Sequence, residues 1–127
     1  MKDLFIDHGL DKRTPLVDFK VSGELKLEGR SIPENPVGFY EPILKWVNDA
    51  YKLHLKDVVF TIKLEYFNTS SSKILMQLIR LLEKYLDESS VKIIWHYNSI
   101  DQDMFESGKD YQSITRIPFE FVEYHEK

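Results

Sequence analysis

Between residues 57 and 86 the hydrophobic pattern of the chain changes its period. Every second residue from Val58 to Tyr66 is apolar and lies on one face of Asp57–Phe67, which predicts a strand. From about Lys73 to Leu86, apolar residues recur at three- and four-residue spacing, which predicts an amphipathic helix. The turn between this strand and this helix is therefore the polar run Asn68-Thr69-Ser70-Ser71-Ser72.

This polar turn has two interpretations. Asn, Ser and Thr are favoured N-cap residues, so in the first interpretation the run only starts the helix. In the second, one hydroxyl is modified or attacked, because the unpaired N–H groups and partial positive charge of a helix N-terminus favour a phosphate. One cap needs one such residue and the run has five, so the sequence leaves both interpretations open at this point.

The segments before the strand predict a hairpin and a helix. Leu16–Val21 and Glu24–Glu28 alternate on either side of a glycine-containing turn, which is typical of a β-hairpin. Asn35-Pro36 resembles an N-cap followed by proline in the first helical position. Pro42 removes an interior hydrogen bond, so either the main helix starts near Glu41 or the helix bends there.

The segments after the polar turn predict two more strands and one more helix. Val91–Tyr97 alternates strongly, and Asp101–Gln112 predicts a short helix capped by its first residue. Ile117–Tyr124 predicts a last strand, in which Pro118 favours an edge position or the strand start.

Strands that alternate with helices favour parallel neighbours joined by crossover helices. We expect Asp57–Phe67 and Val91–Tyr97 to be adjacent and parallel, with the connecting helix packed on the sheet through Ile74, Leu78, Leu81 and Tyr85. The predicted fold is α/β, with a mixed, mostly parallel sheet, an N-terminal β-hairpin and flanking helices. Residues 1–14 carry no clear period and are expected to form a flexible arm, which leaves 15–127 as a single domain.

The composition limits the classes of function. The chain of 127 residues has no cysteine, which excludes disulfides, thiolate catalysis and zinc–thiolate sites. Its net charge of −4 and its lack of a basic stripe argue against nucleic-acid binding. No apolar run approaches the ~18 residues of a membrane span, and the first residues lack the apolar core of a signal peptide. Without a membrane span or a signal peptide, we expect a cytoplasmic protein. The chain also has no metal-ligand or phosphate-loop motif, so we expect neither a metal nor a cofactor.

A small hydrolase or transferase is the alternative function. It would pair a turn serine with His96 and with an acid such as Asp101 or Asp103. The chain lacks a G-x-S-x-G nucleophile elbow, and no glycine near the turn exposes a serine. His96 also lies within a predicted strand, where a structural role is favoured. We therefore predict no catalytic residue and a protein that is not an enzyme.

Three segments of the chain resemble the signatures of a known family. Ile32–Pro36, Leu64–Lys73 and Trp95–Tyr97 look like those of the SiaC family of bacterial regulatory phosphoproteins, whose fold resembles the STAS domain of anti-anti-sigma factors. In that family a Ser/Thr protein kinase phosphorylates a threonine of the N-T-S-S turn, and a PP2C-type phosphatase removes the phosphate. The resemblance implies that Thr69 is the acceptor, and that the unphosphorylated protein binds and controls a diguanylate cyclase or another regulatory target.

The same resemblance predicts a partner surface. If the signatures converge in space, that surface should contain Thr69, Ser70, Glu34 and Asn35, with aromatic support from Phe39 and Tyr40. The alternative is that Glu34 and Asn35 only cap a helix and Phe39 belongs to the core.

Overall fold

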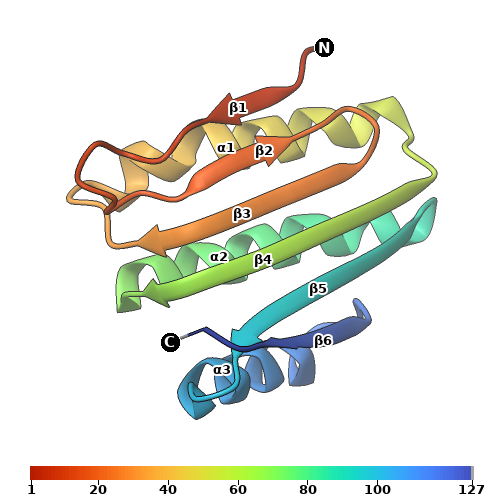
Figure 1. Ribbon diagram of the computed structural model, residues 1–127. Helices are drawn as coiled ribbons and strands as arrows, with labels where there is room; N and C mark the ends of the chain where they lie inside the picture. Colours follow the sequence, from red (N-terminus) through yellow and green to blue (C-terminus); the bar gives the residue numbers. More distant parts are fainter. Residues whose placement is uncertain (127) are drawn as a thin grey trace.

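Six strands form one sheet whose spatial order is the order of the sequence (Figure 1). The computed structural model describes residues 1–126, so residue 127, the end of the predicted domain, lies outside the described residues. The strands are β1 (Leu4–Ile6), β2 (Leu16–Phe19), β3 (Glu24–Ser31), β4 (Asp57–Phe67), β5 (Ser90–Asn98) and β6 (Phe119–Tyr124). Pairing is antiparallel from β1 to β3 and parallel from β3 to β6. The predicted mixed α/β sheet with its N-terminal hairpin is confirmed.

Within residues 1–126, three helices cover one face of this sheet (Figure 1). They are α1 (Pro36–Ala50), α2 (Thr69–Glu83) and α3 (Gln102–Ser113), with short 3₁₀ turns η1 (Tyr51–Leu53) and η2 (Lys84–Asp87). Each helix joins a strand to the next parallel strand in the same direction. Because such crossovers are right-handed, all three helices fall on the same side. The carboxyl ends of β3, β4 and β5 therefore meet the N-termini of α1, α2 and α3 at one edge of the molecule.

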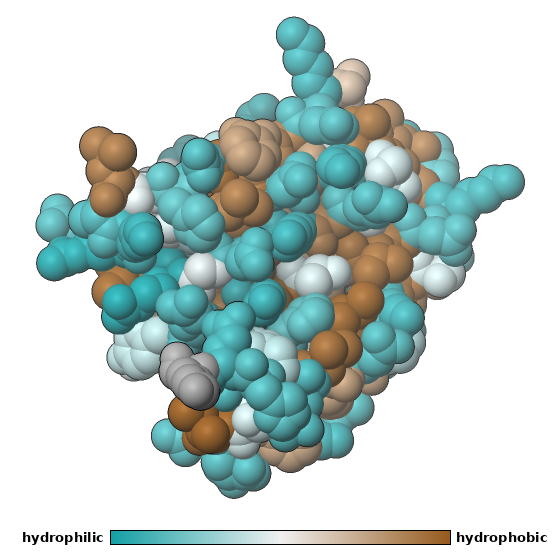
Figure 2. Space-filling model, viewed as in Figure 1, coloured by the Kyte–Doolittle hydropathy of each residue, from teal (hydrophilic) through white to brown (hydrophobic). Residues whose placement is uncertain are grey.

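The other face of the sheet has no covering layer among residues 1–126. Parallel sheets are normally covered on both faces, which makes their strands continuously apolar. Here most outward positions are polar instead, with Val59 and Ile94 among the exceptions, and hydrophilic side chains cover much of this face (Figure 2). The period-two pattern in the sequence is the direct consequence of a sheet that is covered on one side only.

The core lies between the sheet and the helices. The inward residues of β4 and β5 are Val58, Phe60, Ile62, Leu64, Val91, Ile93 and Trp95, all at least 97% buried. The α2 residues that meet them are Ile74, Leu75, Leu78, Ile79 and Leu82. Of the predicted contact residues, Ile74, Leu78 and Tyr85 are buried, whereas Leu81 is only half-buried because it lies at the side of the helix. The prediction that β4 and β5 are adjacent and parallel is also confirmed.

One predicted core position is wrong because β4 contains a bulge. The pairing moves from Gly29–Leu64 to Arg30–Tyr66, so Glu65 is an extra residue in β4. An extra residue reverses which face the following side chains occupy. Tyr66, predicted to be on the apolar face, is 51% exposed, whereas Phe67 turns inward.

Three further details differ from the sequence prediction or resolve it. The helix predicted from Lys73 begins four residues earlier, at Thr69. The helix after Asn35 runs through Pro42 without interruption, and the proline is exposed, so α1 is one element. Within the predicted arm, strand β1 pairs with β2 at the sheet edge. Three residues are too few to show a period, which is why the sequence does not predict β1.

Candidate functional site

Two helix N-termini lie side by side at the carboxyl ends of β3 and β4. Ser31 ends β3 and pairs with Phe67, which ends β4, so the two following turns leave the sheet together. The backbone N–H of Asn68 donates to the carbonyl of Ser31 over 3.1 Å. This contact brings the first signature segment, which follows Ser31, against the second, which contains Thr69.

Each of these helices is capped by an asparagine. The Asn35 side chain accepts from the N–H of Gly38 at 3.1 Å, and the Asn68 side chain accepts from the N–H of Ser71 at 2.9 Å. The first residue of the polar run is therefore the N-cap, and the remaining four form the first turn of α2. Capping accounts for one of the five polar residues, as the first interpretation of this run required.

A buried chain of hydroxyl groups joins α1, β3 and α2. The Tyr40 hydroxyl lies 2.5 Å from Ser31 Oγ, which lies 2.8 Å from Ser71 Oγ. Ser71 Oγ in turn lies 2.9 Å from the carbonyl oxygen of Ser31. All three side chains are fully buried. Ser31 is not among the residues that the sequence predicts for the site, although its position has the same parity in β3 as the buried Leu25 and Leu27.

The direction of this chain follows from counting protons. The carbonyl of Ser31 can only accept, so the single proton of Ser71 is donated there. Ser71 Oγ must then accept from Ser31 Oγ, and Ser31 Oγ must accept from Tyr40. Burial raises the pKa of Tyr40 to about 12, against a smaller lowering by its hydrogen bond to Ser31, so the phenol keeps its proton at neutral pH. Each of the three buried hydroxyls therefore has an acceptor for its proton.

Ser72 connects α2 to α3 in the same manner. The Tyr111 hydroxyl donates to the carbonyl of Ser72 at 2.8 Å, so Ser72 Oγ, 3.0 Å away, donates to the Tyr111 oxygen. Two of the three serines in the polar run therefore hold neighbouring elements together.

Thr69 and Ser70 are the two hydroxyl residues of the run that face solvent. They occupy the first two positions of α2, and neither side chain forms a hydrogen bond within residues 1–126. Their hydroxyls lie at the positive end of a helix that ends near Arg80 and Lys84. Asn68, Ser71 and Ser72 are engaged in the structure, so Thr69 and Ser70 are the hydroxyls that remain accessible to another protein.

The other residues predicted for the partner surface fall into two groups. Glu34 and Asn35 are exposed, and Glu34 pairs with the exposed Arg13 at 3.5 Å. Phe39 is half-buried and packs edge-on against Tyr40, with ring centroids 5.0 Å apart. Tyr40 itself is fully buried, so in this conformation it supports the surface from beneath and does not reach a partner.

The groups required by the hydrolase alternative are dispersed. His96 lies on the uncovered face of β5, where partial burial and then the neighbouring Lys63 lower its pKa. Asp101 caps α3 by accepting from the N–H of Met104 at 3.0 Å. In the part of the chain that the structure describes, no hydrogen bond joins His96 to a hydroxyl of the polar run, so the geometry contains no serine–histidine pair.

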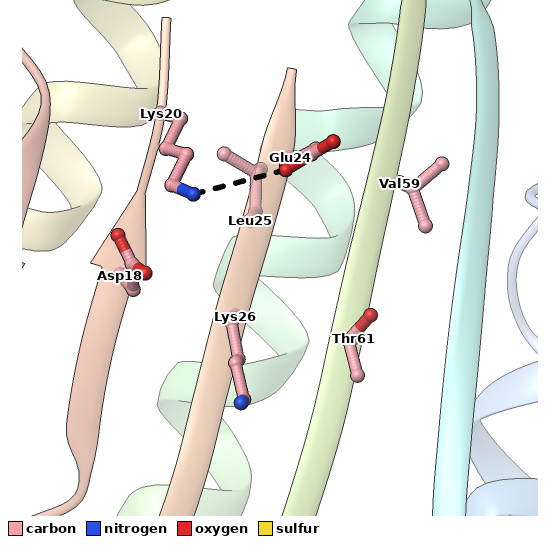
Figure 3. A pocket seen from close by; sticks show the side chains of 7 residues that line it. All are labelled: Asp18, Lys20, Glu24, Leu25, Lys26, Val59 and Thr61. Atoms are coloured by element: carbon pink, nitrogen blue, oxygen red, sulfur yellow. Dashed lines mark ion pairs between the residues drawn. The ribbon is translucent and has the colours of Figure 1, made fainter. Parts of the chain in front are cut away.

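A hollow of about 430 Å³ on the uncovered face is separate from this site (Figure 3). Its lining includes Lys20 and Glu24, which form an ion pair at 3.9 Å, and Val59. Glu24 and Val59 are paired near the amino ends of β3 and β4, whereas Thr69 follows the carboxyl end of β4. The hollow therefore lies toward the opposite end of the strands from the capped helices.

Neither a membrane-spanning helix nor a metal cluster is found in the described part of the chain. None of the helices in residues 1–126 is both long and apolar enough to cross a bilayer. Over the same residues, no three His, Asp or Glu side chains gather as a metal site would require.

Comparison with known proteins gives a consistent result. The family model described as SiaC family regulatory phosphoprotein matches residues 10–124. An uncharacterized protein of Pseudomonas aeruginosa strain UCBPP-PA14 is 27% identical over 99 residues, which cover 77% of this chain and 79% of that protein.

Solved structures of SiaC from Pseudomonas aeruginosa share the fold. The apo-SiaC structure is 26% identical, with a TM-score of 0.85 over 96% of this chain and 99% of that one. A second structure, of SiaC as the activator of the diguanylate cyclase SiaD in complex with it, has a TM-score of 0.88 at 26% identity, covering 96% of this chain and all of the SiaC chain.

Proposed function

Because the chain belongs to the SiaC family of regulatory phosphoproteins, we propose that it is a non-enzymatic switch controlled by reversible phosphorylation of Thr69. The observation that carries this proposal is the way in which side-chain hydrogen bonds are distributed within the polar run. Three of its five residues are hydrogen-bonded through their side chains, whereas Thr69 and Ser70 are exposed without such a bond within residues 1–126. A kinase needs an accessible hydroxyl, and the resemblance to the family signature supports the threonine.

The unphosphorylated protein would bind and control a protein partner. SiaC of Pseudomonas aeruginosa is the activator of the diguanylate cyclase SiaD, with which it forms a complex. By this similarity we propose that the binding partner of this chain is a diguanylate cyclase or a related regulatory target. A Ser/Thr protein kinase and a PP2C-type phosphatase would add and remove the phosphate. All of these reactions would take place in the cytoplasm.

A phosphate on Thr69 would change the charge of the surface without unfolding the domain. It adds about −1.5 to −2 charges, and the first turn of a helix stabilises negative charge. The Tyr40–Ser31–Ser71 chain lies beneath the turn and does not use the Thr69 hydroxyl, so phosphorylation leaves these hydrogen bonds in place. An interface built for a neutral hydroxyl would lose affinity through repulsion or through a buried, unpaired charge.

The partner surface would consist of Thr69 and Ser70 on α2 together with Glu34 and Asn35 at the start of α1. Phe39 and Tyr40 would support it from below. The short connections between Asn68, Ser31 and Ser71 support this arrangement, because they fix the two helix N-termini relative to each other.

Site-resolved mass spectrometry after incubation with the kinase of the same organism tests the proposal. We expect a single added phosphate on Thr69 in the wild-type chain and none in Thr69→Ala. Ser70→Ala is the matched control, because it removes the neighbouring exposed hydroxyl and should still be phosphorylated. Phosphate on Ser71 or Ser72 alone, or on none of the four hydroxyl residues, would contradict the proposal.

A further inference from the structure

The outward face of α2 carries positive charge in a chain that is negative overall. The exposed residues at three- and four-residue spacing from the first turn of α2 to the first residue of η2 are Ser70, Lys73, Gln77, Arg80 and Lys84, and the next residue of this series, the exposed Asp87, is acidic. Three of these five are basic and none is acidic, although the net charge of the chain is −4. Arg80 forms an ion pair with Glu83 at 3.9 Å, and the Glu83 side chain is only 18% exposed. Lys73 and Lys84 form no ion pair within residues 1–126.

An apolar groove runs beside this basic face. It lies between α1 and α2, encloses about 390 Å³ and is lined by Leu44, Met76, Gln77, Arg80, Leu81 and Lys84. We call these six residues the α2 surface. Leu44, Met76 and Leu81 are only half-buried, in contrast to the core residues of the same helices. Met76 also lines a second groove of about 220 Å³ between α2 and α3, which includes Ser72 and therefore reaches the first turn of α2.

We propose that the α2 surface receives an amphipathic helix of the protein partner, with acidic residues beside its apolar stripe. This inference rests on the proposed function, since it names the binding surface of the same switch. The groove lies between two helices, whose backbone N–H and C=O groups are already used within them. An extended peptide would find no main-chain partner there, whereas a helix satisfies its own backbone and needs only an apolar groove.

The charges select the acidic character of the partner. An incoming helix that places its apolar stripe on Met76 has its flank beside Arg80 and Lys84. Acidic side chains at that flank would be complementary to them, and basic ones would be repelled.

The proposed phosphorylation site lies on the same helix as the docking surface. Thr69 begins α2, and Lys73 follows one helical turn later, so the two side chains share one face of the helix. A phosphate on Thr69 would repel the acidic partner and pair with Lys73, thereby removing one of the positive charges. Phosphorylation would thus weaken docking along α2 without any rearrangement of the fold.

A synthetic peptide tests the surface directly. The probe is a helical peptide with leucine along one face and glutamate along both flanks, titrated into the full chain and followed by backbone amide chemical shifts. We expect shifts to cluster on the α2 surface, an affinity about tenfold lower for the same peptide with lysine flanks, and a similar loss after phosphorylation of Thr69. Shifts on the uncovered sheet face, or equal affinity for the two peptides, would overturn the proposal.

Variants separate docking from folding. Met76→Glu should abolish peptide binding, and Lys84→Glu, at an exposed position, should weaken it by about tenfold with the fold intact by circular dichroism. Lys56→Glu is the matched control, because it makes the same charge change in the loop before β4 and should leave affinity unchanged. If sedimentation instead shows that the chain forms a dimer that Met76→Glu dissociates, the occupant is a second copy and the proposal is wrong.

Binding to the diguanylate cyclase of the same organism distinguishes this inference from the proposed function. Loss of cyclase binding in Thr69→Asp, but not in Met76→Glu or Lys84→Glu, would leave the proposed function standing and overturn the α2 surface. Peptide binding as expected, with no cyclase binding by the wild-type chain, would leave the α2 surface standing and reject the cyclase as the target. Parallel loss of cyclase and peptide binding in Lys84→Glu would support both.

Discussion

The hydroxyl of Tyr40 lies 2.5 Å from Oγ of Ser31, and through it the second turn of α1 is tied to the end of β3. Ser31 Oγ is in turn hydrogen-bonded to Ser71 Oγ in the first turn of α2. Because each hydroxyl has one proton, the two ends of the chain are not equivalent. Tyr40 is a donor at the start, and Ser71 is the last donor before the carbonyl of Ser31.

Ser71→Ala should therefore destabilise the protein more than Tyr40→Phe. Removing Ser71 leaves a buried hydroxyl proton without an acceptor, whichever way the remaining groups rotate, and such a group costs about 1–3 kcal/mol. Removing the Tyr40 hydroxyl takes away one donor, but the Ser31 hydroxyl can still donate its proton to Ser71 Oγ. The expected cost is therefore about 0.5–1.5 kcal/mol. Urea unfolding of the two variants measures the difference. Equal losses, or a larger loss in Tyr40→Phe, would show that the protons are arranged differently.

The buried phenol also predicts a loss of stability at alkaline pH. Tyr40 has a folded pKa of about 12 against an ordinary value of 10.0, so between these pH values the unfolded chain binds fewer protons than the folded one. The stabilisation is fully present below pH 10 and is lost as the pH rises toward 12, with a limiting slope of about 1.4 kcal/mol per pH unit. Burial also raises the pKa of Tyr85, which adds a background loss. Tyr40→Phe should therefore have a smaller slope than wild type in urea unfolding across this range.

The bulge in β4 predicts opposite outcomes for two adjacent aromatic residues. Phe67 turns inward and lies 6.2 Å from Trp95 between ring centroids, whereas Tyr66 is 51% exposed. Phe67→Ala should lower the free energy of unfolding by more than about 1 kcal/mol, and Tyr66→Ala should change it by less than about 0.5 kcal/mol. Chemical denaturation tests this pair. The reverse order would mean that the alternation of β4 continues unbroken to its end.

These two aromatics also show where sequence reasoning succeeds and where it stops. The bounds of β4 follow from the sequence, because alternation over eleven residues is a strong signal. The bulge at Glu65 does not, since it depends on the partner strand and leaves no mark in the local pattern. The start of α2 at Thr69 was missed for a related reason. Hydroxyl residues suit both a turn and a first helical turn, and only the bonds to Ser31 and Tyr111 decide between them.

Ser31 is a residue of the site for which the sequence contains a signal that the prediction does not use. It is a polar residue at an inward position of a predicted strand segment, which is unusual enough to require a partner. That partner, Ser71, is 40 residues away, and a single sequence contains no measure of such a distance in space. The proposed acceptor Thr69, by contrast, follows from a local motif that resembles the family signature.

Glu34 predicts a separation between stability and binding. Its ion pair with Arg13 is exposed on both sides, and the Asn35 side chain, not Glu34, caps α1. Glu34→Ala should therefore change the free energy of unfolding by less than about 1 kcal/mol. Weaker cyclase binding by calorimetry in this stable variant would place Glu34 in the partner surface. Unchanged binding would remove it, and Asn35→Ala, which deletes the cap, is the variant expected to lose stability.

Thr69→Asp should raise stability slightly while it weakens partner binding. An acidic side chain in the first turn of α2 interacts favourably with the helix dipole by about 0.3–1 kcal/mol, and the Thr69 hydroxyl makes no bond within residues 1–126 that would be lost. The same charge lies on the proposed interface, where it should reduce cyclase affinity by at least about 1.4 kcal/mol, a factor of ten. Calorimetry and urea unfolding on one preparation measure both effects. Thr69→Asn is the matched control, because it keeps a polar side chain of similar size without the charge and should bind like the wild type. If Thr69→Asp is stable and still binds with wild-type affinity, charge at this position does not control the partner, and the switch must act elsewhere on the molecule.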